Sequence, residues 1–199
     1  MPICSVTVYC SSSTHVAQSY FNAAEATGKA LADNHWSLVY GGNSIGLMKT
    51  VADAVRAGNG KVIGVTPQLM VDKKLHDTLA HELIITNTMR DRKAIMEEKG
   101  DAFLTLPGGL GTFEEIFEII VGKQLGYHNK ALVLLNVDGY FNPLLQMIEH
   151  GIEQKFIKAR SRELYFVTAS VDEAVSYFKS YHPTPKADKW TNDVPSAVE

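Results

Sequence analysis

The sequence predicts an α/β fold in which a doubly wound parallel sheet is flanked by helices. Two observations lead to this prediction. Short runs of strand-forming residues alternate along the chain with longer segments of helical period. This order is typical of βαβ units, because parallel strands need a crossover helix to return to the same edge of the sheet. In addition, residues 131–135 are apolar at every position, as expected for a strand that helices cover on both faces.

The individual elements follow from local composition and period. The alternation of a strand begins at once, with valines at alternate positions of residues 5–9. The predicted strands are 5–9, 37–40, 61–65, 82–85, 102–106, 131–135 and 164–167. Between them lie segments of helical period, which predict helices near 15–34, 46–58, 89–99, 111–126, 140–155 and 171–181.

The length of the chain suits a single domain. Its 199 residues are 45% hydrophobic, which is enough to bury one substantial core. After Tyr181 the sequence becomes polar and contains prolines, HPTPKADKWTNDVPSAVE. We therefore expect one domain over residues 1–181 and a loose C-terminal tail over residues 182–199.

Composition argues against several classes of partner. The formal net charge is -3 and no cluster of Lys and Arg forms a basic face, so we expect no nucleic-acid partner. No apolar run is long enough to span a bilayer, and the start MPICSVTVYC lacks the features of a secretory signal. We therefore expect no membrane partner and a cytoplasmic location, in which Cys4 and Cys10 are free thiols. The histidines form no HxxxH or HxH pair, and we expect no metal.

The loop after the fifth predicted strand, PGGLGT at residues 107–112, has the composition of an anion site. Its proline stops the strand, and its glycines permit a close approach of the backbone to a ligand. We expect Thr112 to be the N-cap of the next helix, whose dipole and unpaired N–H groups favour an anion. The spacing fits neither a dinucleotide fingerprint nor a Walker loop, so a single monophosphate is the predicted ligand.

Two carboxylates, Glu114 and Glu115, follow this loop directly. One interpretation is structural, since residues 112–115 match a capping box and Glu114 would complement the helix dipole. The other is catalytic. When the N-glycosidic bond of a nucleotide breaks, C1′ of the ribose gains oxocarbenium character, which a carboxylate at Glu115 would stabilise. Residue types alone leave both interpretations open.

A mixed-charge segment, MRDRK at residues 89–93, opens the helix after the fourth predicted strand. It is compatible with an ordinary solvated first turn. The planar donor fork of Arg92 would also suit a phosphate or a carboxylate, so that Arg92 could grip the substrate and keep Glu115 ionised. Lys93 could add a second positive charge.

Taken together, these segments resemble the Lonely Guy family, the cytokinin-activating phosphoribohydrolases that were long mislabelled as lysine decarboxylases. The family's signature PGGxGTxxE is present without a mismatch at residues 107–115. Its second element, a methionine, two variable residues and Arg-Lys, is present at residues 89–93. The resemblance extends through YGGNSIGLM and LLNVDGYFNPLL, and so covers the chain from Cys10 to about Phe156.

The resemblance implies a Rossmann-like and usually dimeric protein. Its implied substrate is an N6-substituted adenosine 5′-monophosphate, hydrolysed to the free base and ribose 5-monophosphate, and we expect no cofactor. It further implies that Arg92 and Glu115 are catalytic. The implied substrate-binding residues are Gly108, Gly109, Leu110, Gly111 and Thr112 in the glycine-rich loop, and Gly42, Glu82, Met89, Lys93 and Glu114 around the nucleotide.

Three other functions fit parts of the sequence. Residues 42–46 spell GxSxG between a strand and a helix, as in a serine esterase, but no HGGG-like segment precedes them and His182 falls in the expected tail. A decarboxylase using pyridoxal phosphate would need a Schiff-base lysine, and no lysine here has a motif to recommend it. A nucleotide carrier or sensor would use the same phosphate loop without turnover.

The helix after the glycine-rich loop carries an apolar stripe. Phe113, Ile116, Phe117 and Ile120 recur at helical spacing and are expected to pack in the core. Ile119 and Val121 widen the stripe, which would suit a helix-to-helix seam in a homodimer.

Overall fold

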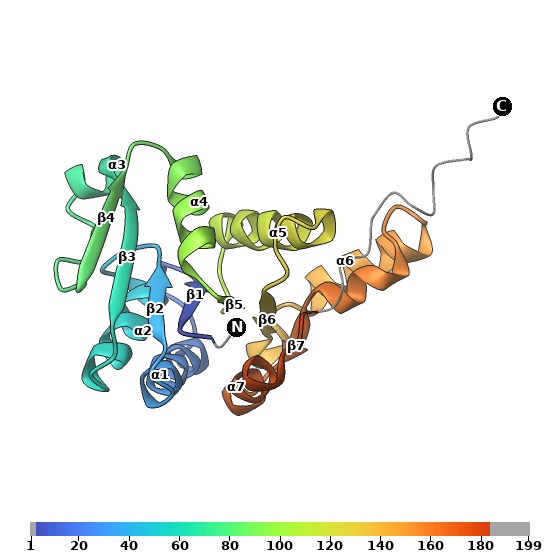
Figure 1. Cartoon of the computed structure of the whole chain (residues 1–199), viewed down its shortest axis with the longest axis horizontal. Helices are drawn as coiled ribbons and strands as arrows, with labels where there is room; N and C mark the ends of the chain where they lie inside the picture. Colours follow the sequence, from blue (N-terminus) through green and yellow to red (C-terminus); the bar gives the residue numbers. More distant parts are fainter. Residues whose placement is uncertain (1–2, 184–199) are drawn as a thin grey trace.

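A computed structural model describes residues 3–183 of the chain. They form one sheet with the strand order β4-β3-β2-β1-β5-β6-β7, in which every neighbouring pair is parallel. The chain fills the sheet outward from β1 in one direction and then in the other, which confirms the prediction of a doubly wound α/β fold (Figure 1). The strands are β1 (Ser5–Tyr9), β2 (Ser37–Tyr40), β3 (Val62–Pro67), β4 (Glu82–Thr86), β5 (Ala102–Thr105), β6 (Ala131–Leu135) and β7 (Phe166–Thr168).

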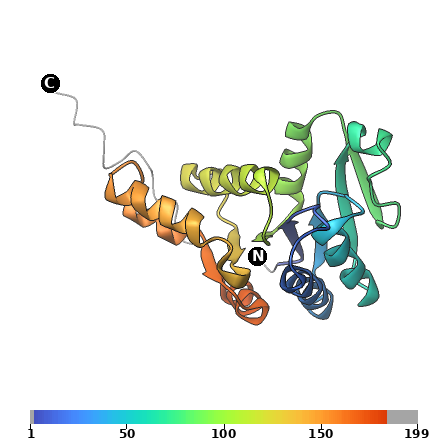
Figure 2. The same cartoon turned by 180° about the vertical axis from the view of Figure 1, so that it is seen from behind.

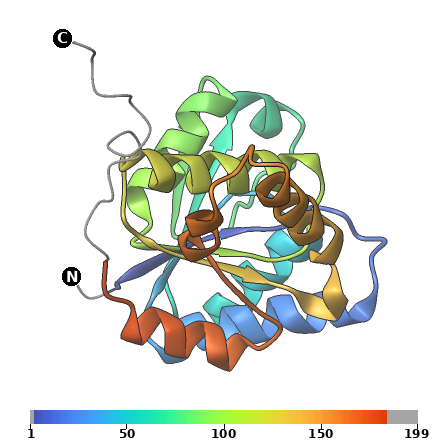
Figure 3. The ribbon, with the colours of Figure 1, turned by 90° about the vertical axis from the view of Figure 1, so that its right-hand side faces the viewer.

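Helices cover both faces of the sheet, and Figure 3 shows these layers from the side. One face carries α1 (Gln18–Asp33), α2 (Gly46–Ala57) and α7 (Val171–Ser180). The other carries α4 (Met89–Lys99) and α5 (Leu110–Leu125). In Figures 1 and 2, α6 (Asn142–Glu153) projects to the side of the molecule beyond α5.

The core is divided by the sheet into two apolar layers. Along β6, Ala131, Val133 and Leu135 pack in the layer that contains α1, α2 and α7, whereas Leu132 and Leu134 pack in the layer beneath α4 and α5. Alternate residues of a strand point to opposite faces, so a strand buried on both faces must be apolar at every position. The run 131–135 is therefore apolar at every position because helices cover both faces of β6, as the sequence predicted.

Element boundaries differ from the predictions at several points. The last strand is β7 at Phe166–Thr168, because Leu164 ends a 3-10 helix, η2 (Ala159–Leu164). Two further short helices, α3 (Gln68–Asp72) and η1 (Val137–Gly139), were not predicted. Helices of this length are too short to show a helical period in the sequence. Helix α5 begins at Leu110, which changes the position of Thr112 within its first turn.

Two sequence predictions concern the ends of the chain and the membrane. Of the tail predicted over residues 182–199, the part from 184 onward lies outside the described residues. Among residues 3–183, no helix combines the length and the apolar character needed to cross a bilayer.

Candidate active site

A cleft of about 390 Å³ opens at the carboxyl edge of the sheet. Its volume lies in the range of small-molecule sites. Among the described residues, its walls come from the segments that follow β1 to β5, and none comes from a segment that follows β6 or β7. The lining residues are Cys10, Ser11, Ser12, Ser13, Gly41, Asn43, Met48, Pro67, Met70, Met89, Arg92, Gly109, Gly111, Thr112 and Glu115.

The centre of the cleft is an ion pair between two helices. Arg92 of α4 donates from Nη1 to Oε1 of Glu115 in α5 over 2.7 Å, and both side chains are only 6% exposed. The Nε atom of Arg92 donates to the carbonyl oxygen of Val65 in β3 over 3.0 Å. The guanidinium is therefore held at two of its nitrogens, which fixes the face that it presents to the cleft.

The position of Glu115 in α5 excludes the capping-box interpretation. The N-cap of α5 is Gly109, so Thr112 is the third helical residue and the prediction that it caps the helix is wrong. A capping box would require the Thr112 position to lie outside the helix. Glu115 lies within the helix and its side chain reaches Arg92 instead. Helix α5 begins at Leu110 rather than at Phe113, and Gly109, with φ of -91° and ψ of -156°, is the last extended residue before it.

Burial and charge act on Glu115 in opposite directions. Desolvation raises the pKa of the Glu115 carboxyl, and the neighbouring Arg92 guanidinium lowers it by a smaller amount. The net pKa is raised above the ordinary value of a glutamate. A carboxylate with little water around it interacts strongly with any cation that forms beside it.

The glycine-rich loop presents bare backbone to the same cleft. Gly109 and Gly111 line the cleft, and a Cβ atom on either would meet nothing within 4 Å. Gly108 is needed for another reason, since a Cβ atom there would lie 2.1 Å from Oγ1 of Thr112. From behind the loop, the hydroxyl of Tyr140 donates to the carbonyl oxygen of Gly108 over 2.5 Å. The N-terminus of α5 is thus open toward the cleft and supported on its far side.

The loop after β2 forms the next wall. Gly42 has a φ of +67° and Gly46 a φ of +61°, values that favour glycine. Asp77 fixes this loop, because its N–H donates to the carbonyl oxygen of Gly42 over 2.7 Å. The Asp77 carboxylate is itself held by the hydroxyl of Tyr40 and by the guanidinium of Arg56, at 2.6 and 2.7 Å.

Of the residues expected around the nucleotide, Met89 lines the cleft. Gly42, Gly108 and Leu110 lie near the cleft but are not part of its lining, and Leu110 is 86% exposed. Lys93 forms ion pairs of 2.6 Å with Glu114 and with Glu118. These three side chains stabilise the contact between α4 and α5, and neither Lys93 nor Glu114 is part of the lining.

Glu82 is not brought to the cleft, and the expectation that it contributes to the pocket is corrected. It is the first residue of β4 and therefore lies at the amino edge of the sheet. Its carboxylate pairs there with Lys99 at 3.1 Å and with Lys61 at 3.3 Å. In a parallel sheet the cleft opens at the other end of the strands.

The sequence reasoning missed part of the lining. Ser11, Ser12 and Ser13 follow β1, and Asn43 and Met48 follow β2, so their places after predicted strands were a usable signal. Met70 belongs to α3, which was not predicted, and it carried no signal. In residues 3–183, no three His, Cys, Asp or Glu side chains come together in a way that could hold a metal ion.

The esterase interpretation finds no support in this geometry. The hydroxyl of Ser44 donates to the carbonyl oxygen of Leu75 over 3.1 Å, and Ser44 is not part of the cleft lining. His182 follows α7, which lies on the opposite face of the sheet from Arg92 and Glu115. A catalytic serine would need a histidine within hydrogen-bonding reach.

Comparisons with solved structures agree on the fold. A molybdenum cofactor binding protein from Rippkaea orientalis is 21% identical and has a TM-score of 0.67, covering 90% of this chain and 96% of that one. The molybdenum cofactor carrier protein of Chlamydomonas reinhardtii is 22% identical with a TM-score of 0.66, covering 87% of this chain and 94% of that one. At these identities the likeness concerns the fold alone.

Comparisons with curated sequences reach further. The family model described as "Possible lysine decarboxylase" matches residues 48–178. The cytokinin riboside 5′-monophosphate phosphoribohydrolase LOG5 of Arabidopsis thaliana is 40% identical over 178 residues, which are 89% of this chain and 78% of that protein. The enzyme of the same name from Rhodococcoides fascians is 41% identical over 88% of this chain and 89% of its own length. Identity at this level over most of both chains shows that this protein belongs to the Lonely Guy family.

Proposed function

We propose that this protein is a phosphoribohydrolase. Its substrate is adenosine 5′-monophosphate or an N6-substituted derivative, and its products are the free base and ribose 5-monophosphate. Residues 1–181 act as one hydrolase domain that needs no cofactor. The observation that carries the proposal is the buried Arg92–Glu115 pair, which lies in the same cleft as the open N-terminus of α5. The names of the curated relatives point to the same reaction.

In this proposal the N-terminus of α5 binds the phosphate. Unpaired N–H groups of the first turn and the positive end of the helix dipole both favour an anion there. Gly109 and Gly111 leave room for the phosphate oxygens to reach the backbone, and the buried Thr112 lies beside them. The anchored phosphate then holds the ribose over the middle of the cleft.

Glu115 acts on the sugar. As the bond from C1′ to the base nitrogen breaks, its electron pair leaves with the base and positive charge develops on C1′ and the ring oxygen. The Glu115 carboxylate stabilises that charge more in the transition state than in the ground state. The oxygen of a water molecule ends on C1′ and a proton ends on the base. Arg92 orients the carboxylate and the substrate.

We further propose that the protein is a homodimer in the cytoplasm. Phe117 (40%), Met147 (67%) and Phe156 (89%) line one apolar groove formed by α5, α6 and the segment after α6, and Val121 (44%) of α5 is exposed as well. The predicted burial of Phe117 is therefore corrected, whereas Ile116 and Ile120 are buried as expected. Ile119, which was expected to widen a dimer seam together with Val121, is also buried, and that expectation is wrong for Ile119. Contiguous apolar surface of this kind is typical of an interface.

The test is direct. The purified protein is incubated with AMP and with isopentenyl-AMP, and free base and ribose 5-phosphate are measured. Equal amounts of the two products are expected from at least one substrate. Binding of AMP without any release of base over a long incubation would instead support the carrier or sensor interpretation, and the hydrolase proposal would fail.

A further inference from the structure

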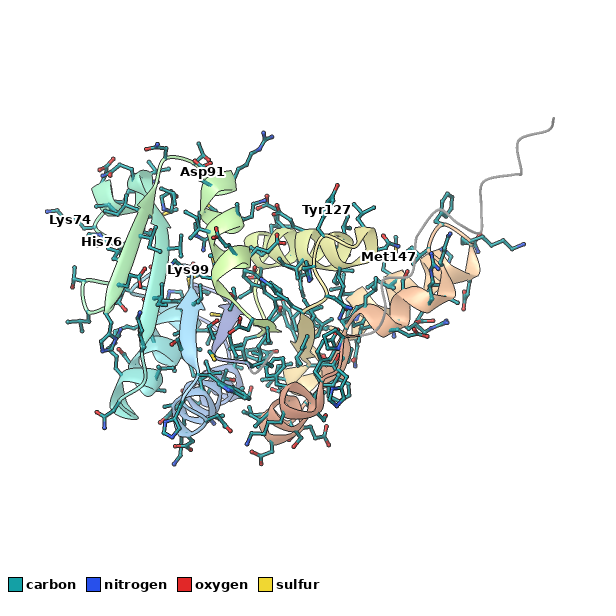
Figure 4. The ribbon with its side chains drawn as sticks, in the orientation of Figure 1. Lys74, His76, Asp91, Lys99, Tyr127 and Met147 are labelled. Atoms are coloured by element: carbon teal, nitrogen blue, oxygen red, sulfur yellow. The ribbon has the colours of Figure 1, made fainter. Side chains whose placement is uncertain are left out.

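Asn43 is held firmly at the wall of the cleft. It follows β2 and forms an isolated antiparallel bridge with His76, which Figure 4 labels on the segment leading to β4. The residues on either side of it are tied to the same segment. The N–H of Ser44 donates to the carbonyl oxygen of Leu75 over 2.8 Å, and the carbonyl oxygen of Gly42 accepts from Asp77 over 2.7 Å. The backbone at Asn43 therefore has little freedom to move.

The side chain of Asn43 has no such partner. Its Oδ1 atom is buried and accepts no hydrogen bond within the described part of the chain. Two other partly buried asparagines have side-chain partners: Asn34 donates to the carbonyl oxygen of Ala30, and Asn136 accepts from the N–H of Phe141. A buried carbonyl without a donor is unfavourable, and such groups call for a specific explanation.

The usual structural reasons for an asparagine do not apply. Asn43 is not among the described residues with a positive φ, so it is not needed for a left-handed turn. Its Oδ1 atom accepts no N–H from its own loop, so it does not stabilise an Asx-turn. What remains is its place on the cleft wall. Because Oδ1 itself is closed to solvent, a rotation of the side chain would bring it to a ligand bound in the cleft.

The order of the strands says which part of a nucleotide would reach it. The phosphate loop follows β5, and β1 and β2 are the next strands in the sheet. Neighbouring strands are about 4.8 Å apart, so the loop after β2 lies roughly 10 Å from the loop after β5. The cleft extends in this direction only, since no described residue after β6 or β7 lines it. The base of a nucleotide anchored at α5 would then extend along the cleft toward the loops after β2, β3 and β4, and Asn43 lies in the first of these loops.

We propose that the side-chain amide of Asn43 recognises the 6-amino group of the purine and so selects 6-aminopurine nucleotides over 6-oxopurine nucleotides. This inference rests on the proposed function. An asparagine amide pairs an acceptor with a donor, and adenine offers the matching N6–H donor beside the N7 acceptor. An N6-substituted adenine keeps one N6–H. A 6-oxopurine offers two acceptors at these positions and leaves Oδ1 unpaired.

The test compares AMP with inosine 5′-monophosphate (IMP), which carries the same ribose phosphate. Ribose 5-phosphate release gives kcat/KM for both. The wild type is expected to favour AMP. Asn43→Ala should lower kcat/KM for AMP about 10-fold and leave that for IMP within about twofold. Asn43→Asp keeps the acceptor but replaces the donor, so it should reduce the use of IMP more than that of AMP. Asn87→Ala, an exposed asparagine before α4, is the matched control and should change neither value.

The outcomes separate the two proposals. If the wild type releases ribose 5-phosphate from none of AMP, IMP and isopentenyl-AMP, the proposed function fails; if only isopentenyl-AMP is hydrolysed, it replaces AMP in the comparison with a 6-oxopurine nucleotide. If it hydrolyses AMP and both Asn43 variants keep the wild-type ratio of AMP to IMP, the function stands and the role of Asn43 is refuted. Thermal unfolding of each variant shows whether the fold is retained, and the nearly isosteric Asn43→Asp keeps the test decisive if Asn43→Ala does not fold.

Discussion

Gly41 lies directly against the guanidinium of Arg92. A Cβ atom on Gly41 would stand 2.1 Å from Nη2 of Arg92 and 3.2 Å from Sδ of Met48. Arg92 has no room to yield, because its other nitrogens are bonded to Val65 and to Glu115. The glycine at the end of β2 is thus a condition for the placement of the arginine.

Gly41→Ala should therefore displace the guanidinium and lower kcat by about 100-fold, because loss of one oriented charged donor typically has an effect of this size. Steady-state kinetics with AMP measure the effect. Gly60→Ala, at a glycine outside the cleft lining, is a comparison for the general cost of a crowded glycine. Wild-type kcat in Gly41→Ala would show that Arg92 does not need its present position.

Glu115→Gln should abolish most turnover while the protein still binds AMP. The amide can still accept from Arg92, but it carries no charge to stabilise the oxocarbenium ion, so kcat should fall at least about 100-fold. Calorimetry with AMP tests binding separately. Glu118→Gln is the matched control, since it removes a half-exposed carboxylate of the same helix that pairs with Lys93. Equal losses in the two variants would refute the role of Glu115.

Acidification should stop the reaction at a higher pH than an ordinary glutamate would require. Burial raises the pKa of Glu115. As the pH falls, its active carboxylate form is therefore protonated while the pH is still above about 4.3, the ordinary pKa of a glutamate. A profile of kcat/KM between pH 4 and 8 locates this limb, because kcat/KM reports the titration of the free enzyme. If activity fell only at or below the ordinary pKa of a glutamate, the group whose titration limits the reaction would not be the buried carboxylate of Glu115.

Stability should change in the opposite sense over the same window. A carboxyl whose pKa is raised in the folded state binds more protons folded than unfolded. Its contribution to the free energy of unfolding is therefore present at low pH and lost as pH rises through the folded pKa. Denaturant unfolding of the wild type and of Glu115→Gln at each pH measures this difference. A gap between the two proteins that does not vary with pH would rule it out.

Gly111→Ala should make the protein more stable and a poorer binder of substrate. Alanine is favoured over glycine in a helix by about 0.5–1 kcal/mol, and a Cβ atom on Gly111 meets no atom within 4 Å. The added methyl group would nevertheless lie where the phosphate approaches α5, so KM for AMP should rise several-fold. The melting temperature and KM are measured on the same sample. An unchanged KM would show that the phosphate does not bind at this turn.

The exposed apolar patch predicts the oligomeric state. Light scattering should give about twice the mass of the 21.9 kDa chain. Phe117 and Met147 line one apolar groove. The double variant Phe117→Asp/Met147→Asp should have the mass of one chain. Leu79→Asp, at a leucine that is 67% exposed on the segment before β4, should leave the mass unchanged. A wild-type protein of single mass would reject the homodimer.

The sequence by itself determined the fold class and the two catalytic candidates. Strand-forming runs and helical periods are local properties, so the alternation that produces a parallel sheet can be read directly from residues such as 131–135. The glycines of the PGGLGT loop and the carboxylate after it are likewise local, and they indicated both an anion site and Glu115.

Only the tertiary structure decided which partner Glu115 has and which residues share its cleft. The capping box with Thr112 was equally compatible with the sequence, and the crossing of α4 over α5 replaced it with Arg92. Glu82 had the right chemistry, but its register in β4 puts it at the amino edge. Asn43 follows a predicted strand, but its bridge to His76 is a contact that no local pattern shows. Side chains meet at a site through the order and register of strands, and these depend on contacts between residues far apart in the chain.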